Sequence, residues 1–216
     1  MITDPNFARE LAGDLLEINA VMLRPREPFV WSSGWNAPIY CDNRLTMLYP
    51  DIRRKIARKF AGIIRSDFPE TEVVTGTAIS GIPHSAWVAD LLDKPMAYVR
   101  GKTKVYGLGN QIEGGVKKGQ PTILIEDLVS TGTSVLSVAD TLRFVGADVR
   151  GILSIFTYGF KISEESFTRH DLPFRALTDY PTLLEVALER KVISPADLDY
   201  LNEWRQNPDT WPAKPV

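Results

Sequence analysis

The sequence predicts an α/β fold in which a parallel central sheet is flanked by helices. Between about residues 72 and 156, short apolar runs alternate with segments of helical periodicity, and such alternation is typical of a parallel sheet covered on both faces. The chain has 216 residues, of which 44% are hydrophobic and 24% charged, as expected for one globular domain. The net charge of −2, without a visible basic stripe, argues against a nucleic-acid partner.

The side-chain pattern predicts the elements in order along the chain. Residues 7–22 are expected to form an amphipathic helix, since Leu11, Leu15, Ile18 and Met22 repeat at intervals of three or four. The elements expected after it are extended chain at 29–41, a helix at 50–65, a strand at 72–77, a helix at 81–92, strands at 96–99 and 123–126, a helix at 134–145, a strand at 148–156, and helices at 183–191 and 195–205.

One domain is expected over residues 1–206, with an N-terminal cap over about 1–48 and a core over about 50–180. Residues 207–216 hold three prolines and are expected to form a flexible tail. The sequence shows no signal peptide and no run of roughly 20 apolar residues, so a membrane partner is not expected. Its single cysteine, Cys41, excludes an internal disulfide, fits a cytoplasmic location, and is expected to pack as a small buried side chain.

The segment ILIEDLVSTGTS, residues 123–134, carries the strongest functional signal. An apolar strand is expected to stop at Glu126 and Asp127, and a turn rich in Ser, Thr and Gly then opens a helix. Ligands of open parallel sheets bind at the carboxyl ends of strands, and a helix N-terminus offers unpaired N–H groups to a phosphate. Simple helix capping is the commoner explanation of such a turn by itself, but two adjacent carboxylates favour a ligand with sugar hydroxyls. A ribose 5-phosphate site is the interpretation that accounts for both features.

This segment resembles the phosphoribosyl-diphosphate (PRPP) motif of type I phosphoribosyltransferases. The resemblance implies that Glu126 and Asp127 hold the ribose 2′ and 3′ hydroxyls, with Asp127 near the reacting centre, and that residues 130–134 bind the 5-phosphate. It also implies the fold of that family, with a small N-terminal hood. The PRPP-binding positions implied in this segment are Glu126, Asp127, Leu128, Val129, Ser130, Thr131, Gly132, Thr133 and Ser134.

The segment VRGKTKVYGLGNQIEGG, residues 99–115, is a glycine-rich loop with three cations, Arg100, Lys102 and Lys104. These cations suit a diphosphate, although a solvated surface loop is the alternative. The segment resembles the catalytic loop of bacterial orotate phosphoribosyltransferases. The likeness assigns Arg100 and Lys104 to the diphosphate, with Lys104 the main catalytic cation, and adds Tyr106 where many members carry histidine. In that family the loop reaches the neighbouring subunit's site, which implies a homodimer with shared active sites.

The segment FVWSSGWNAPIYCDNRL, residues 29–45, is similar to the base-binding segment of the same family, although a hydrophobic edge ribbon would show a comparable pattern. A flat anionic base needs amide donors and an aromatic or apolar floor, which an irregular strand with hydroxyl and aromatic side chains can provide. The residues that the likeness places against orotate are Ser33, Gly34, Tyr40, Ser130 and Tyr158.

The segment 77–85, TAISGIPHS, looks like the pyrophosphate loop of the family, at a second turn between a strand and a helix. Some relatives carry cations at the positions of Ser32, Ser80 and Tyr158, so backbone N–H groups and Ser130 are expected to contact the orotate carboxylate instead. His84 lies near this loop and is expected to be a satisfied polar residue without a catalytic role.

The resemblance implies transfer of the 5-phosphoribosyl group from PRPP to orotate, giving orotidine 5′-phosphate and pyrophosphate in UMP biosynthesis. Mg²⁺ is the implied cofactor, held mainly through PRPP and water, with no metal site made of protein side chains alone. Two alternatives stay open at this point. The first is a phosphoribosyltransferase for another base, such as a purine. The second is a non-enzymatic regulator that senses PRPP or a nucleotide, although this chain keeps the loop cations Arg100, Lys102 and Lys104.

Overall fold

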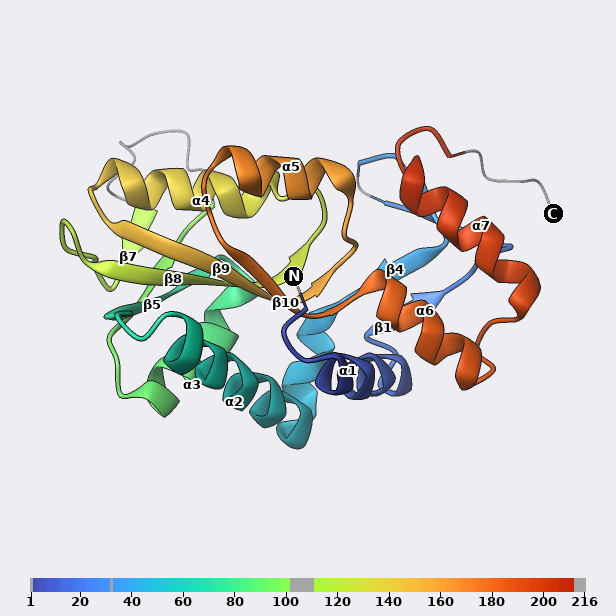
Figure 1. Cartoon of the computed structure of the whole chain (residues 1–216), viewed down its shortest axis with the longest axis horizontal. Helices are drawn as coiled ribbons and strands as arrows, with labels where there is room; N and C mark the ends of the chain where they lie inside the picture. Colours follow the sequence, from blue (N-terminus) through green and yellow to red (C-terminus); the bar gives the residue numbers. More distant parts are fainter. Residues whose placement is uncertain (1, 32, 102–110, 212–216) are drawn as a thin grey trace.

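The computed structural model describes residues 2–31, 33–101 and 111–211. Its centre is a six-stranded sheet in the order β10-β9-β8-β5-β6-β7 (Figure 1). The strands are β5 (Val73–Thr77), β6 (Met96–Val99), β7 (Ile112–Glu113), β8 (Pro121–Val129), β9 (Asp148–Thr157) and β10 (Phe174–Asp179). The edge strand β7 runs antiparallel to β6 while the others are parallel. The predicted parallel central sheet is confirmed, and the two-residue edge strand β7, which was not predicted, adds an antiparallel return that needs no crossover helix.

Helices cover both faces of this sheet, as the alternating pattern predicted. The pair α2 (Pro50–Asp67) and α3 (Gly81–Leu92) lies on one face, and the pair α4 (Thr133–Phe144) and α5 (Lys161–Arg169) lies on the other (Figure 1). Successive side chains of a strand point to opposite faces. Accordingly, Ile123 and Ile125 belong to the core under α2 and α3, whereas Leu124 belongs to the core under α4 and α5.

A second layer of structure, the hood, lies beyond the β10 edge of the sheet and combines elements from the N-terminal and C-terminal parts of the chain (Figure 1). Its elements are α1 (Pro5–Glu17), β1 (Val21–Leu23), β2 (Phe29–Val30), β3 (Asn36–Ala37), β4 (Ile39–Cys41), α6 (Tyr180–Glu189) and α7 (Pro195–Gln206). The fully buried Trp204 of α7 donates its Nε1–H to the carbonyl of Asn36 at 3.2 Å. Because the C-terminal helices are part of this layer, the hood is not built from the N-terminal segment alone.

The first helix is shorter than its periodicity predicted. It ends at Glu17, and Asn19 adopts a left-handed φ of 56°, a conformation that ends helices. Residues Val21–Leu23 then pair antiparallel with β4, so Met22 lies in a strand. A short apolar stretch satisfies helical and strand periodicity alike, and pairing with a distant segment decides between them here.

Two further differences from the sequence analysis concern the C-terminal part of the chain. The elements α5 and β10 were not predicted, and α5 is mostly polar and buries only Ser163 and Phe167. The tail is ordered as far as Trp211, which is 5% exposed and packs on Tyr200 with 4.6 Å between ring centroids. Residues 212–216 lie outside the described part. Across residues 2–31, 33–101 and 111–211, no helix combines the length and hydropathy that a bilayer crossing needs.

Candidate active site

The site is assembled where β8 gives way to α4. The strand runs through Glu126 and Asp127 to Val129, so the prediction that it stops at the two carboxylates is wrong. It continues because β9 is long enough to pair with it as far as Val129. The carboxylates therefore project from a rigid strand and not from a loop, and the turn 130–132 that follows leads directly into α4.

The turn that opens α4 has the features of a phosphate cradle. Gly132 has a φ of 83°, in the left-handed region that favours glycine, and a Cβ at this position would lie 3.3 Å from the Phe167 ring. The hydroxyls of Thr131 and Thr133 lie 3.1 Å apart at the helix N-terminus. Hydroxyl donors and unpaired helix N–H groups thus converge at one end of α4, which suits an anionic group.

The two carboxyl groups on β8 are poorly solvated. Glu126 is 8% exposed and its Oε1 accepts a hydrogen bond from the Asp127 N–H at 3.0 Å. Burial, together with the neighbouring Asp127 charge, raises the pKa of Glu126 well above its ordinary value, and burial raises the pKa of Asp127. Hydrogen bonds donated to a carboxylate offset this effect. A ligand that presents hydroxyl donors, such as the 2′ and 3′ hydroxyls of a ribose, would therefore be favoured at this pair.

A second turn, Thr77–Ser80 between β5 and α3, lies beside the carboxylates because β5 is the neighbour of β8. The hydroxyl of Ser80 forms a hydrogen bond to Asp127 that opposes the rise of its pKa. At Gly81 a Cβ would collide with the carbonyl of Ile125 and lie 2.6 Å from Thr77 Oγ1. Glycine is therefore needed there for α3 to start this close to β8.

A cavity of about 580 Å³ opens next to the Ser130 turn. Its lining residues are Val30, Trp31, Ser33, Trp35, Tyr40, Cys41, Leu128, Ser130, Thr131 and Tyr158. Four of the five residues predicted to contact the base therefore line one cavity. The fifth, Gly34, has a φ of 85° and donates its N–H to the Trp31 carbonyl at 2.8 Å, so its place is in the turn that shapes the wall.

Aromatic rings form much of this cavity. Trp31 lies 5.1 Å from Tyr158 and is stacked on Trp35 at 6.5 Å between centroids. Its indole N–H donates to the Ile39 carbonyl at 3.0 Å, which fixes the ring. Neither tryptophan was predicted from the sequence; the signal that could have found them is the pair of rings on either side of the turn in WSSGW. Tyr158 also lines the cavity, but it is only 2% exposed and is stacked on Phe160 with 5.3 Å between ring centroids.

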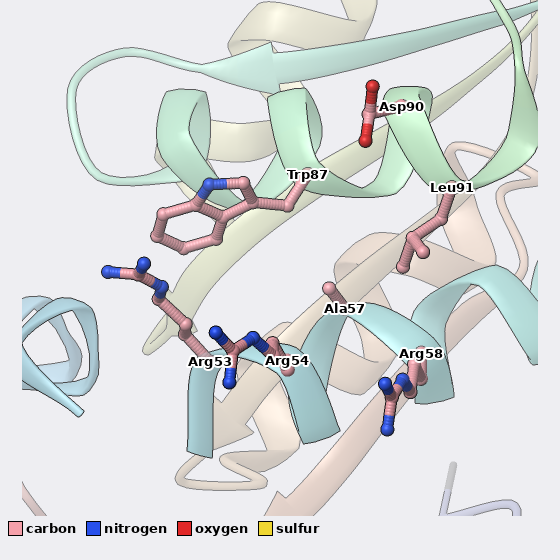
Figure 2. A pocket seen from close by; sticks show the side chains of 7 residues that line it. All are labelled: Arg53, Arg54, Ala57, Arg58, Trp87, Asp90 and Leu91. Carbon is pink, nitrogen blue, oxygen red and sulfur yellow. The ribbon is translucent and has the colours of Figure 1, made fainter. Parts of the chain in front are cut away.

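Two further cavities differ from this cavity in most of their lining residues. One of about 710 Å³ shares Trp35 and Thr131 with it and also includes Arg205, whose guanidinium donates to the carbonyls of Tyr158 and Gly159 at 3.0 and 2.8 Å. The other, of about 260 Å³, lies between α2 and α3 (Figure 2). Arg53 lies over the Trp87 ring at 5.1 Å there, and none of its described lining residues belongs to the predicted site.

The cationic loop is only partly described. Arg100 follows β6, its N–H donates to the Gln111 carbonyl at 2.8 Å, and its Nε lies 3.2 Å from Glu113 Oε1. Lys102, Lys104 and Tyr106 fall within residues 102–110, outside the described residues, so their assignments stay predictions. Within the described ranges, no three or more His, Cys, Asp or Glu side chains gather in a way that could hold a metal ion.

Two residues set aside by sequence reasoning have defined surroundings. Cys41 was expected to be buried, and in the structure it is half-buried. Its thiol donates a hydrogen bond to Asn43 Oδ1 at 3.5 Å. Burial, together with the nearby Asp127 charge, raises the pKa of the thiol. This environment disfavours a nucleophilic thiolate. His84 is 1% exposed, and its Nδ1 has no hydrogen-bond partner among the described residues, so the prediction of a satisfied histidine is wrong for that atom. Burial lowers the pKa of His84 to about 4, which keeps the ring neutral.

Comparison with known proteins gives close relatives over nearly the whole chain. The chain is 54% identical to the orotate phosphoribosyltransferase of Halalkalibacterium halodurans over 200 residues, covering 93% of this chain and 95% of the relative. It is 52% identical to the enzyme of that name from Bacillus subtilis, with 93% of each chain covered. A solved orotate phosphoribosyltransferase from Aeropyrum pernix superposes with a TM-score of 0.74 at 28% identity, covering 85% of this chain and 99% of that one. No family model matches the chain.

Proposed function

The chain belongs to the orotate phosphoribosyltransferase family, and on this premise we propose which residues perform each part of its reaction. The enzyme transfers the 5-phosphoribosyl group of PRPP to orotate, giving orotidine 5′-phosphate and pyrophosphate in pyrimidine biosynthesis. The observation that carries the assignment of residues is the direct adjacency of three features. The carboxylate pair lies near the end of β8, the hydroxyl-rich start of α4 follows it, and the turn 130–132 between them lines the aromatic cavity.

PRPP is proposed to bind along the end of β8. Thr131, Thr133 and the first N–H groups of α4 would hold the 5-phosphate, since donors and helix dipole both favour an anion there. Glu126 and Asp127 would accept hydrogen bonds from the ribose hydroxyls, which relieves the poor solvation of two adjacent buried carboxyls. The sugar is thereby held by rigid strand and helix positions, as precise orientation of the reacting carbon requires.

Orotate is proposed to occupy the 580 Å³ cavity. The rings of Trp31 and Tyr158 offer apolar surface, while the hydroxyls of Ser33 and Ser130 offer donors to an anionic base. The base is already anionic, so little general-base assistance is needed at its N1. The residues of this wall thus act mainly by orienting N1 toward the ribose carbon.

Breaking the bond between C1 and pyrophosphate is the demanding step, because positive charge develops on the ribose and negative charge on the leaving group. The Asp127 carboxylate is proposed to stabilise the positive centre. The turn Thr77–Ser80 would receive the leaving diphosphate, but its sequence TAIS contains no cation. Arg100 and Lys104, with Tyr106 as a hydrogen-bond donor, are therefore proposed to neutralise the leaving charge.

Mg²⁺ is the proposed cofactor. The donor set fits a hard cation held chiefly by substrate, because Glu126 and Asp127 supply oxygen atoms and the described residues offer no larger cluster of ligands. When bound, the ion would neutralise diphosphate charge. Glu126 and Asp127 would meanwhile hold the ribose hydroxyls beside it.

A homodimer with shared active sites is proposed, with the loop of one subunit completing the site of the other. A cytoplasmic location is also proposed, which the single cysteine favours. Mixing a Lys104→Ala protein with an Asp127→Asn protein tests the sharing. If the sites are shared, a random mixture regains about a quarter of wild-type activity, since half of the dimers are mixed and each has one complete site of two. A mixture as inactive as its components contradicts shared sites.

The assignment of residues is tested by following orotate's ultraviolet absorbance with PRPP and Mg²⁺. We expect Lys104→Ala to lower kcat about a hundredfold or more, because such an electrostatic contact contributes about 3 kcal/mol in the transition state. Lys117→Ala, an exposed lysine beyond the loop, is the matched control and should retain normal turnover. Near-normal kcat in Lys104→Ala would remove that residue from the mechanism. With adenine in place of orotate, release of pyrophosphate from PRPP should be abolished.

A further inference from the structure

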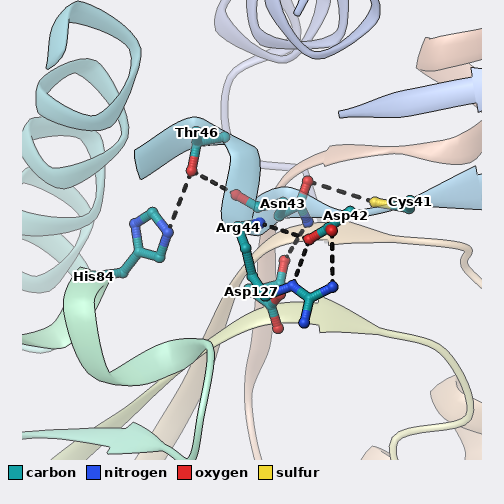
Figure 3. A network of polar contacts seen from close by, with 7 residues as sticks. All are labelled: Cys41, Asp42, Asn43, Arg44, Thr46, His84 and Asp127. Carbon is teal, nitrogen blue, oxygen red and sulfur yellow. Dashed lines mark hydrogen bonds and ion pairs between the residues drawn. The ribbon is translucent and has the colours of Figure 1, made fainter. Parts of the chain in front are cut away.

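Asn43 occupies the point where the segments of the site meet. It begins the 3-10 turn η1 (Asn43–Leu48), directly after β4, and its exposed fraction is 0%. Its Nδ2 donates to the backbone carbonyl of Asp127 at 2.7 Å, and its Oδ1 accepts from the Cys41 thiol at 3.5 Å (Figure 3). The side-chain amide of Asn43 thus donates a hydrogen bond to β8, which carries Asp127, and accepts one from Cys41, which lines the base cavity.

The same turn also reaches the helix behind the proposed pyrophosphate loop. Thr46 Oγ1 donates to the Asn43 carbonyl at 2.6 Å and lies 3.5 Å from His84 Nε2 (Figure 3). His84 belongs to α3, which starts immediately after the turn 77–80. Consecutive polar contacts therefore link Asn43 to the strand that carries Asp127, to the base cavity and to α3 behind the proposed pyrophosphate loop.

The bond to Asp127 replaces a missing contact of the sheet. Pairing between β8 and β5 ends at Ile125 and Gly76, so Asp127 lies beyond the last residue pair of these two strands. On the other side of β8, pairing with β9 continues through Glu126 and Leu128. Its N–H is taken by the Glu126 carboxylate, and its carbonyl by Asn43. A buried carbonyl without a donor is costly, and this donor also fixes the peptide that carries the Asp127 side chain.

We propose that Asn43 is a positioning residue for the phosphoribosyl transfer, which fixes the Asp127 carboxylate relative to the base cavity. The amide is suited to this because it donates and accepts at once, which a carboxylate or an aliphatic side chain of the same size cannot do. Through its hydrogen bonds to Asp127 and Cys41, Asn43 connects β8 to the lining of the base cavity. The inference rests on the proposed role of Asp127.

The test is a double-mutant cycle of Asn43→Ala with Asp127→Asn, measured as kcat/KM for PRPP and as thermal midpoint. Asn43→Ala alone should lower kcat/KM about ten- to a hundredfold, as expected when a reacting group is misplaced. In the Asp127→Asn background the same change should have little further effect on kcat/KM, while its effect on the midpoint stays the same. A purely structural residue would show the same change in each quantity in both backgrounds, with no coupling to Asp127.

Thr71→Val is the matched control, because Thr71 is 1% exposed and its hydroxyl closes a turn onto the Phe68 carbonyl at 2.7 Å. It should lower the midpoint and leave kcat/KM per folded protein unchanged in both backgrounds. If Asn43→Ala does not fold, Asn43→Asp keeps the volume and the acceptor but removes the donor, and the same non-additivity is expected.

Two results would overturn the inference in distinguishable ways. Additive losses of kcat/KM, with Asp127→Asn itself strongly impaired, would refute the role of Asn43 and leave that of Asp127 intact. Normal kcat/KM in Asp127→Asn alone would refute the proposed function of that carboxylate, and the role of Asn43 with it.

Discussion

Replacing Glu126 by glutamine separates the destabilising effect of a buried charge from its use in binding sugar hydroxyls. Glutamine keeps the size of the side chain and an oxygen that can accept from the Asp127 N–H, the bond seen at 3.0 Å. It removes an ionised group that is 8% exposed and adjacent to a second carboxyl. We therefore expect Glu126→Gln to be more stable than the wild type at neutral pH and to bind PRPP poorly.

The pH dependence follows from the direction of the pKa change. Burial and the Asp127 charge raise the pKa of Glu126 above its ordinary value of 4.5 in the folded protein, so the folded state binds the proton more tightly than the unfolded state. Wild-type stability is then lost as the pH rises from about 4.5 to the raised value. Glutamine has no such loss, so the advantage of the variant should be absent below pH 4.5 and constant above the raised pKa.

The magnitude follows from the cost of burying a polar group without full compensation, which is about 1–3 kcal/mol. A gain of that order at neutral pH is expected when glutamine removes the buried charge. For a chain of this size each 1 kcal/mol moves the thermal midpoint by about 2–4 °C. The assay is calorimetry of both proteins from pH 4 to 8, with the exposed Glu72→Gln as control, expected within about 0.5 kcal/mol of wild type. A midpoint difference that is independent of pH, or negative at pH 7, would refute the reasoning.

Three other predictions concern packing and binding. Gly81→Ala should destabilise the protein by about 1–3 kcal/mol in urea unfolding, because a Cβ there collides with the Ile125 carbonyl; an unchanged midpoint would contradict the close approach. Tyr180→Phe removes a buried hydroxyl that donates to the Leu201 carbonyl at 3.1 Å, and should destabilise by about 1 kcal/mol in the same assay. Orotate should quench tryptophan fluorescence through Trp31, which lines the cavity, and Trp31→Phe should lose most of that signal; equal quenching in the variant would place the base elsewhere.

Local sequence signals predicted the parts of the fold that depend on neighbouring residues. The bounds of α3 and β6 follow directly from turn residues and apolar runs, and α2 begins at Pro50 as its proline predicts. The region from residue 18 to 22 was misassigned, because its apolar residues suit a helix and a strand equally and β4 is the partner that selects the strand.

The sequence by itself determined which chemical groups are available to this protein: two adjacent carboxylates, a hydroxyl-rich turn and a cationic loop, each recognisable as a short segment. Only the tertiary structure decided how these are positioned. The Asn43 side chain donates a hydrogen bond to the Asp127 carbonyl, 84 positions away in the chain, and the Trp204 indole donates one to the Asn36 carbonyl, 168 positions away. The raised pKa values of Glu126 and Asp127 likewise come from burial by surrounding elements. Such contacts leave no local pattern, because each partner is selected by packing in space and not by its sequence neighbours.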